Sequence, residues 1–145
     1  MQENDKTQAI FGAFDGLTSG LGVLIALLLQ HQGQIHLFNI VLGLAVSSGL
    51  SMGYGEWLAD GEGVERRAFV IGGATGLGTF IPALPFILLH GFFAYAFSLI
   101  GMYLTCMYVG RLRGRDPKLT REVFYGVLLV TVLVVICEWV TGGIA

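Results

Sequence analysis

Five apolar stretches follow one another along this chain of 145 residues, and each is long enough to cross a lipid bilayer as a helix. About 20 apolar residues, each rising about 1.5 Å, span a hydrocarbon core of roughly 30 Å. The stretches cover about residues 9–29, 35–59, 68–89, 92–110 and 123–141. Because lipid offers no hydrogen bonds to a bare backbone, such segments fold as helices. We expect one all-α integral membrane domain over residues 1–145, with a short polar tail at residues 1–8.

The composition agrees with a membrane location and narrows the partners. Hydrophobic residues make up 54% of the chain, charged residues 12%, and the mean hydropathy is +0.75. A soluble domain carries about 25% charged residues. A nucleic-acid partner is not expected, because the net charge is −2 and no basic cluster is interleaved with aromatic residues.

The basic residues predict the orientation of the helices. All eight Lys and Arg residues lie on one side of the membrane if the N-terminus is cytoplasmic. Lys6 precedes the first span, and Arg66 and Arg67 lie between the second and third. The others surround the fourth loop: Arg111, Arg113, Arg115, Lys118 and Arg121. Since cytoplasmic loops are rich in Lys and Arg, we expect a cytoplasmic N-terminus and an external C-terminus. Without an organellar targeting signal, a prokaryotic cell membrane is expected.

Glycines at four-residue spacing predict how the helices associate. The pattern occurs in each of the first three spans: Gly12, Gly16 and Gly20; Gly49 and Gly53; Gly72 and Gly76. Small residues at this spacing allow two helix backbones to approach closely. We expect these faces to serve helix packing rather than to contact a substrate.

Three carboxylates lie inside the apolar stretches, which contain no Lys or Arg to neutralise them: Asp15, Glu56 and Glu138. Placing an ionised carboxylate at the bilayer centre costs roughly 2.5–3.5 kcal/mol on insertion scales. Each acid must therefore be protonated, hydrated or close to a cation. The pattern indicates a membrane protein that moves cations.

Two of these acids share polar helix faces with other potential ligands. Asp15 lies on one face with Thr18 and Ser19, and Glu56 follows Ser48 and Met52 at four-residue intervals. Because the first two helices run antiparallel, we expect Asp15, Met52 and Glu56 to occupy one layer near the cytoplasmic side. Carboxylate and thioether ligands together suit Fe²⁺ or Mn²⁺ better than Mg²⁺ or Ca²⁺. The site prediction is Asp15, Met52 and Glu56 as metal ligands, with the three hydroxyl groups lining the pathway.

Simpler interpretations of these residues stay open. Glu56 could extend to the membrane surface, and Met52 could be an ordinary packing residue. Glu138 lies near the outer end of the fifth span, where an interfacial acid is the first interpretation and an exit-side ligand the second. The three histidines lie on the outer side without metal-ligand spacing.

Two segments resemble the signature helices of the vacuolar iron transporter family. They are residues 11–19, FGAFDGLTS, and residues 49–59, GLSMGYGEWLA; residues 82–86, PALPF, resemble the proline-bearing end of that family's third helix. The resemblance implies a homodimer that exports Fe²⁺ and related ions from the cytoplasm, usually driven by a proton gradient, along a pathway between the subunits. It also implies that Asp15 and Met52 line this pathway and that Glu56 lies near its entrance.

The chain departs from the family pattern in two places. Phe14 replaces the Asn that typically precedes the signature Asp. A cytoplasmic Glu-rich domain between the second and third spans is replaced by about eight residues, 60–67. Asp60, Glu62 and Glu65 could form a reduced entrance patch there, although a solvated charge run is the simpler interpretation.

The sequence therefore predicts a multi-pass membrane transporter rather than an enzyme. Its cargo is Fe²⁺ or Mn²⁺, no cofactor is bound permanently, and its partners are a second copy of itself, protons and the lipid bilayer. The alternative is a membrane assembly or partner-binding protein that keeps the fold without metal flux. A carrier of organic cations would need an aromatic cage, which the sequence does not suggest.

Overall fold

The computed structural model describes residues 3–30, 33–60, 65–89, 92–113 and 117–141, and within these ranges it is helical with no strand. The elements, in chain order, are α1 (Glu3–Leu29), α2 (Gln34–Asp60), α3 (Glu65–Phe80), the 3₁₀ turn η1 (Ile81–Ala83), α4 (Pro85–Leu88), α5 (Phe92–Arg113) and α6 (Pro117–Val140). Five segments are long and apolar enough to cross a membrane: Asp5–Leu29, Gln34–Ala59, Glu65–Leu88, Phe93–Leu112 and Arg121–Val140. The all-α class and the five membrane-length segments expected from the sequence are thus confirmed.

The first helix begins earlier than the sequence predicted. α1 starts at Glu3, so most of the expected polar tail is helical and continuous with the first span. Polar residues in this extension contact α2 and α3, as described below. Hydropathy does not reveal this helical extension, because tertiary contacts hold the extra turns.

The third membrane-length segment is broken near its end by two prolines. Pro82 and Pro85 have no backbone N–H, so the α-helical pattern gives way to η1 and the short α4. The Leu84 N–H bonds the carbonyls of Phe80 and Ile81 at 3.2 and 3.3 Å. The buried hydroxyl of Ser98, on α5, donates to the Pro82 carbonyl at 2.7 Å. A neighbouring helix therefore satisfies a backbone group at the break, as apolar surroundings require.

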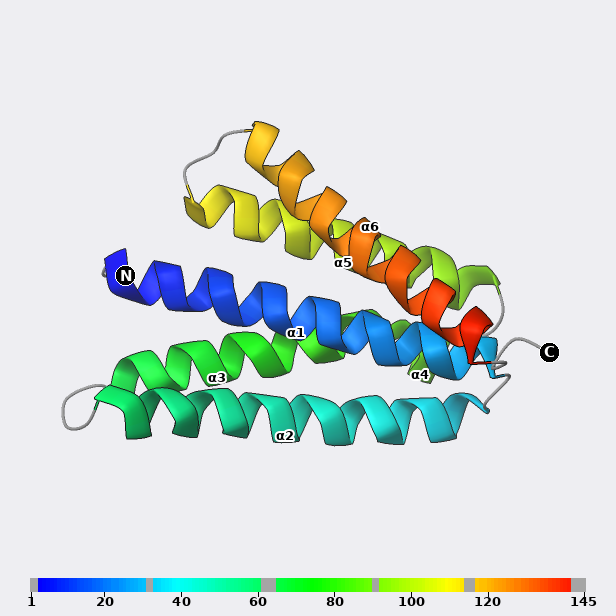
Figure 1. Cartoon of the computed structure of the whole chain (residues 1–145), viewed down its shortest axis with the longest axis horizontal. Coiled ribbons are helices and arrows are strands. Elements are labelled where there is room, and N and C mark those ends of the chain that lie inside the picture. The colour runs from blue at the N-terminus through cyan, green and yellow to red at the C-terminus, as the bar shows by residue number, and fades with distance from the viewer. Residues whose placement is uncertain (1–2, 31–32, 61–64, 90–91, 114–116, 142–145) are drawn as a thin grey trace.

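Helix α3 runs between α1 and α2, and glycines make both contacts (Figure 1). On α1, Gly12, Gly16 and Gly20 lie directly against the backbone of α3 at Ile71, Thr75 and Thr79. On α2, Gly49 and Gly72 face each other, and a Cβ on either would come within 2.8 Å of the other's carbonyl oxygen. The predicted role of the glycine faces in close packing is confirmed.

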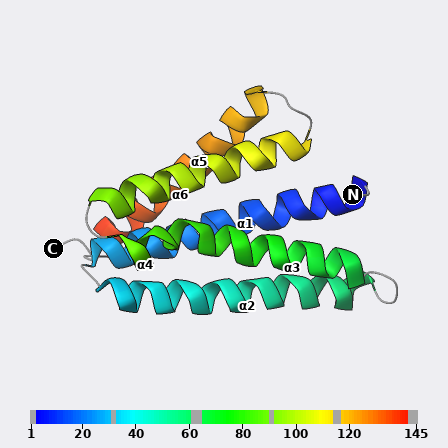
Figure 2. The same ribbon diagram turned by 180° about the vertical axis from the view of Figure 1, so that it is seen from behind.

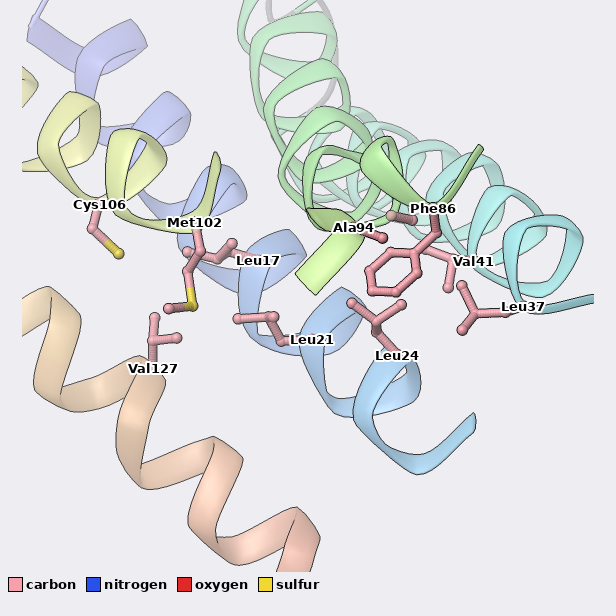
Figure 3. Packing of buried hydrophobic residues seen from close by; sticks show 11 residues of the cluster. Leu17, Leu21, Leu24, Leu37, Val41, Phe86, Ala94, Met102, Cys106 and Val127 are labelled. Atoms are coloured by element: carbon pink, nitrogen blue, oxygen red, sulfur yellow. The ribbon is translucent and has the colours of Figure 1, made fainter. Parts of the chain in front are cut away.

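Helices α5 and α6 cover α1 on the side away from α2 and diverge from it toward the N-terminal end (Figures 1 and 2). Where they meet α1, Leu17 and Leu21 lie toward Met102 and Val127 in the buried cluster, while Leu24 lies beside Phe86 (Figure 3). Where they diverge, a cavity of about 520 Å³ separates α1 from Val109 of α5 and Val123 of α6. The molecule thus combines a tight three-helix unit with a more loosely attached helical pair.

The N-terminal end of the bundle carries the basic side chains that the structure describes. It is formed by the start of α1, the α2–α3 connection and the α5–α6 connection (Figure 1). These side chains are Lys6, Arg66, Arg67, Arg111, Lys118 and Arg121. We call this the basic end. The end of α6 lies at the opposite end, as expected for five membrane-length segments that run alternately up and down.

Candidate functional site

Asp15 lies in the middle third of α1 and is half-buried. In the part of the chain that the structure describes, no hydrogen bond or ion pair engages its carboxylate. Its neighbours Phe14 and Gly16 have different surroundings, because Phe14 packs on Gly126 of α6 and Gly16 packs on α3. Asp15 is therefore an acid at membrane depth that no described side chain balances.

Glu56 and Gln8 connect α2 to α1 near the basic end. Gln8 Nε2 donates to Glu56 Oε1 at 2.9 Å, and both side chains are half-buried. Glu56 is thus held against α1, rather than extended alone toward the membrane surface. Among the described residues its hydrogen-bond partner is the neutral amide of Gln8, so no described cation compensates this carboxylate.

This contact also sets the relative depth of the predicted ligands. Counted along each helix from the Gln8–Glu56 contact, Met52 lies four residues and Asp15 seven residues farther from the basic end. At about 1.5 Å per residue, the two differ by about 4.5 Å in depth, while Asp15 lies about 10 Å deeper than Glu56. By this count, Asp15 and half-buried Met52 differ by less than one helical turn in depth, and Glu56 lies nearer the basic end. That position suits an entrance better than a layer shared with Asp15.

The hydroxyl groups near these ligands bond mainly to their own helices. Thr18 donates to the backbone carbonyls of Phe14 and Asp15, both at 3.0 Å. Ser48 lies 3.4 Å from the Ala45 carbonyl and 3.4 Å from the Thr79 hydroxyl of α3, and Ser19 is half-buried. Their oxygen atoms can still accept a hydrogen bond, so a pathway-lining role stays a prediction for all three.

The other predicted acids whose side chains the structure describes, Glu65 and Glu138, lie at opposite ends of the bundle. Glu65 is exposed at the start of α3, the side chain of Asp60 lies outside the described part of the chain, and so does Glu62. Glu138 is half-buried near the opposite end of α6 and accepts a hydrogen bond from Gln30 Nε2 at 3.4 Å. This contact favours the interfacial interpretation of Glu138.

The described ranges contain no group of three or more His, Cys, Asp or Glu side chains that could hold a metal ion. His36 is exposed, and His31 and His90 lie outside those ranges. Any coordination by the described residues would therefore combine a carboxylate with other donors, such as the Met52 thioether.

Two residues near the basic end were missed by the sequence analysis. Asp5 is 1% exposed and forms an ion pair with Arg66 of α3, with 2.9 Å between Oδ2 and the guanidinium nitrogen. Gln8 makes the contact to Glu56 described above. Helical periodicity could have found Gln8, because it precedes Asp15 by two turns and so shares its face. Nothing in the local sequence pairs Asp5 with Arg66.

Comparisons with protein-family models, with curated proteins and with solved structures found no match to this chain.

Proposed function

We propose that this protein transports divalent transition-metal ions, Fe²⁺ or Mn²⁺, and exports them from the cytoplasm in the manner of the vacuolar iron transporters it resembles. The observation that carries the proposal is Asp15: a half-buried acid at membrane depth whose charge no described side chain balances. Carboxylates inside membrane spans usually mark ion pathways. Met52 supplies a softer ligand within one turn of the same depth, and this mixed pair favours transition metals.

Proton coupling follows from the chemistry of the same carboxylate. A metal ion binds the deprotonated form, so binding at Asp15 releases any proton held there. A proton entering from the outside would in turn displace the metal ion. The proposal therefore includes exchange of the metal for protons at Asp15.

A second copy of the chain is part of the proposal. A stripe of small and polar residues at four-residue spacing winds along α2, and all of them are exposed in the single chain: Asn39, Gly43, Ser47, Ser51 and Gly55. Small and polar residues of this kind support helix association in membranes. Ser51 and Gly55 directly precede Met52 and Glu56, so a homodimer joined here would place the two sets of predicted ligands near each other.

Metal uptake into proteoliposomes tests the proposal. Purified protein would be reconstituted with a metal-sensitive dye inside, and Mn²⁺ and Fe²⁺ uptake measured with and without a pH gradient. We expect flux that the gradient accelerates, and at least about a tenfold loss in Asp15→Asn, because the neutral amide is a far weaker ligand for a divalent ion. Glu122→Gln, at an exposed acid of α6, is the matched control and should keep its flux.

Two results would contradict the proposal. One is a folded, reconstituted protein that carries neither ion; this would favour the non-transporting membrane assembly. The other is wild-type flux in Asp15→Asn, which would exclude this carboxylate from the pathway.

A further inference from the structure

Two acids lie at the basic end near the first turns of α1: Asp5 on α1 itself and Glu56 on α2. Their side-chain partners differ in charge. Asp5, almost fully buried, is paired with the guanidinium of Arg66 at 2.9 Å. One turn farther along α1, Glu56 accepts a hydrogen bond from the neutral amide of Gln8, also at 2.9 Å. The charge of Asp5 is therefore compensated by a cation of the protein, while that of Glu56 remains available to a mobile cation.

The contact also restricts how Glu56 can bind an ion. Gln8 Nε2 donates to Oε1 and uses one of its lone pairs, so Oε2 is the oxygen with both lone pairs free for a metal ion. A carboxylate held in this way favours binding through that one oxygen. Ca²⁺ takes six to eight oxygen ligands and often uses both oxygens of a carboxylate, whereas smaller divalent ions need fewer. Partners that orient a metal-binding carboxylate typically change metal affinity or activity by about 10–100-fold when mutated.

We propose that Gln8 is a positioning residue that fixes Glu56 with one free oxygen and so makes the entrance favour transition-metal ions over Ca²⁺. The inference rests on the proposed function and adds a determinant of its selectivity. Gln8 acts through Glu56, and its amide must be neutral, because a cation at this position would remove the charge that attracts the metal.

Two substitutions at Gln8 separate positioning from a structural link between α1 and α2. Gln8→Leu removes the donor at similar size. We expect about a tenfold higher KM for Mn²⁺ with a similar maximal rate, and stronger inhibition of Mn²⁺ uptake by Ca²⁺. Gln8→Lys can restore the link as an ion pair but neutralises Glu56, so we expect it to lose uptake at low Mn²⁺ concentration. If Gln8→Leu does not fold, Gln8→Ala replaces it.

Gln30→Leu is the matched control. Gln30 directly follows the last residue of α1 and also donates its amide to a glutamate, Glu138, but at the opposite end of the bundle. We expect it to keep the wild-type KM and the wild-type response to Ca²⁺. Thermal unfolding in detergent shows whether each variant is folded.

The inference is overturned if folded Gln8→Leu keeps the wild-type KM and Ca²⁺ inhibition, or if Gln8→Lys transports like the wild type, as a purely structural link predicts. Binding of Mn²⁺ to the detergent-solubilised protein, measured by electron paramagnetic resonance, separates this failure from that of the proposed function. Absence of flux in the wild type contradicts the proposed transport. About tenfold weaker Mn²⁺ binding in Gln8→Leu supports the role of Gln8 even then, and unchanged binding refutes it.

Discussion

Gly16 of α1 has no room for a side chain, and its surroundings explain how α1 and α3 come so close. A Cβ at this position would overlap the Thr75 carbonyl of α3 and lie 2.9 Å from the Thr79 backbone nitrogen. These neighbours are backbone atoms, which cannot move aside as a flexible side chain could. Any side chain at residue 16 therefore has to push the two helices apart.

We predict that Gly16→Ala destabilises the protein by about 1–3 kcal/mol, the usual cost of inserting a methyl group into a closely packed contact. Gly73→Ala on α3 is the control, because nothing lies within 4 Å of a Cβ built there. Alanine is the better helix former by about 1 kcal/mol, so Gly73→Ala should be neutral or slightly stabilising. Thermal unfolding in detergent compares the two variants. Equal unfolding temperatures would contradict the close contact between α1 and α3 at Gly16.

The candidate ligands differ in how far the sequence could predict them. Asp15 was predictable, because an acid within a long apolar segment needs no knowledge of tertiary structure. The proximity in depth of Asp15 and Met52 followed from two antiparallel helices joined by a short turn. The Gln8–Glu56 contact and the contact between the Ser48 and Thr79 hydroxyls were not predictable. Both depend on how each helix is rotated about its axis relative to its neighbours.

The third membrane-length segment combines a feature that the local sequence predicts with one that depends on a neighbouring helix. Pro82 and Pro85 predict a disturbed helix, and the structure has η1 and α4 there. Which group compensates for the disturbance depends on α5, whose Ser98 reaches the Pro82 carbonyl. Similarly, the five apolar segments were predictable from length and hydropathy, whereas the extension of α1 to Glu3 was not, because its polar residues bond to other helices.

We predict that Ser98→Ala destabilises the protein by about 0.5–2 kcal/mol, because the buried Pro82 carbonyl loses a hydrogen-bond donor. Thr131→Val on α6 is the control. Thr131 is half-buried, and its hydroxyl bonds the Val127 carbonyl of its own helix at 3.0 Å. Chemical denaturation in mixed micelles should show a shift for Ser98→Ala alone. Equal shifts in both variants would mean that the break near Pro82 does not depend on α5.

Across the whole bundle, the ends of the helices and the basic side chains indicate the same orientation. Five membrane-length segments place the start of α1 and the end of α6 at opposite ends (Figure 2). The described basic side chains gather at the end that holds the start of α1. Because Lys and Arg are retained on the cytoplasmic side, this end is expected to face the cytoplasm. The proposed export then runs from Glu56 toward Asp15, away from the basic end.

Cysteine labelling tests this orientation and, with it, the direction of transport. In a Cys137→Ser background, the native Cys106 is buried and should not react with a membrane-impermeant maleimide, which provides the blank. We expect Lys6→Cys and Arg111→Cys to react in inside-out vesicles and Thr141→Cys in right-side-out vesicles, because these side chains are exposed at opposite ends. Reaction of Lys6→Cys and Thr141→Cys from the same side would contradict five crossings. Reversal of all three would keep the fold but invert the transport direction, since the basic end and Glu56 would then face the exterior.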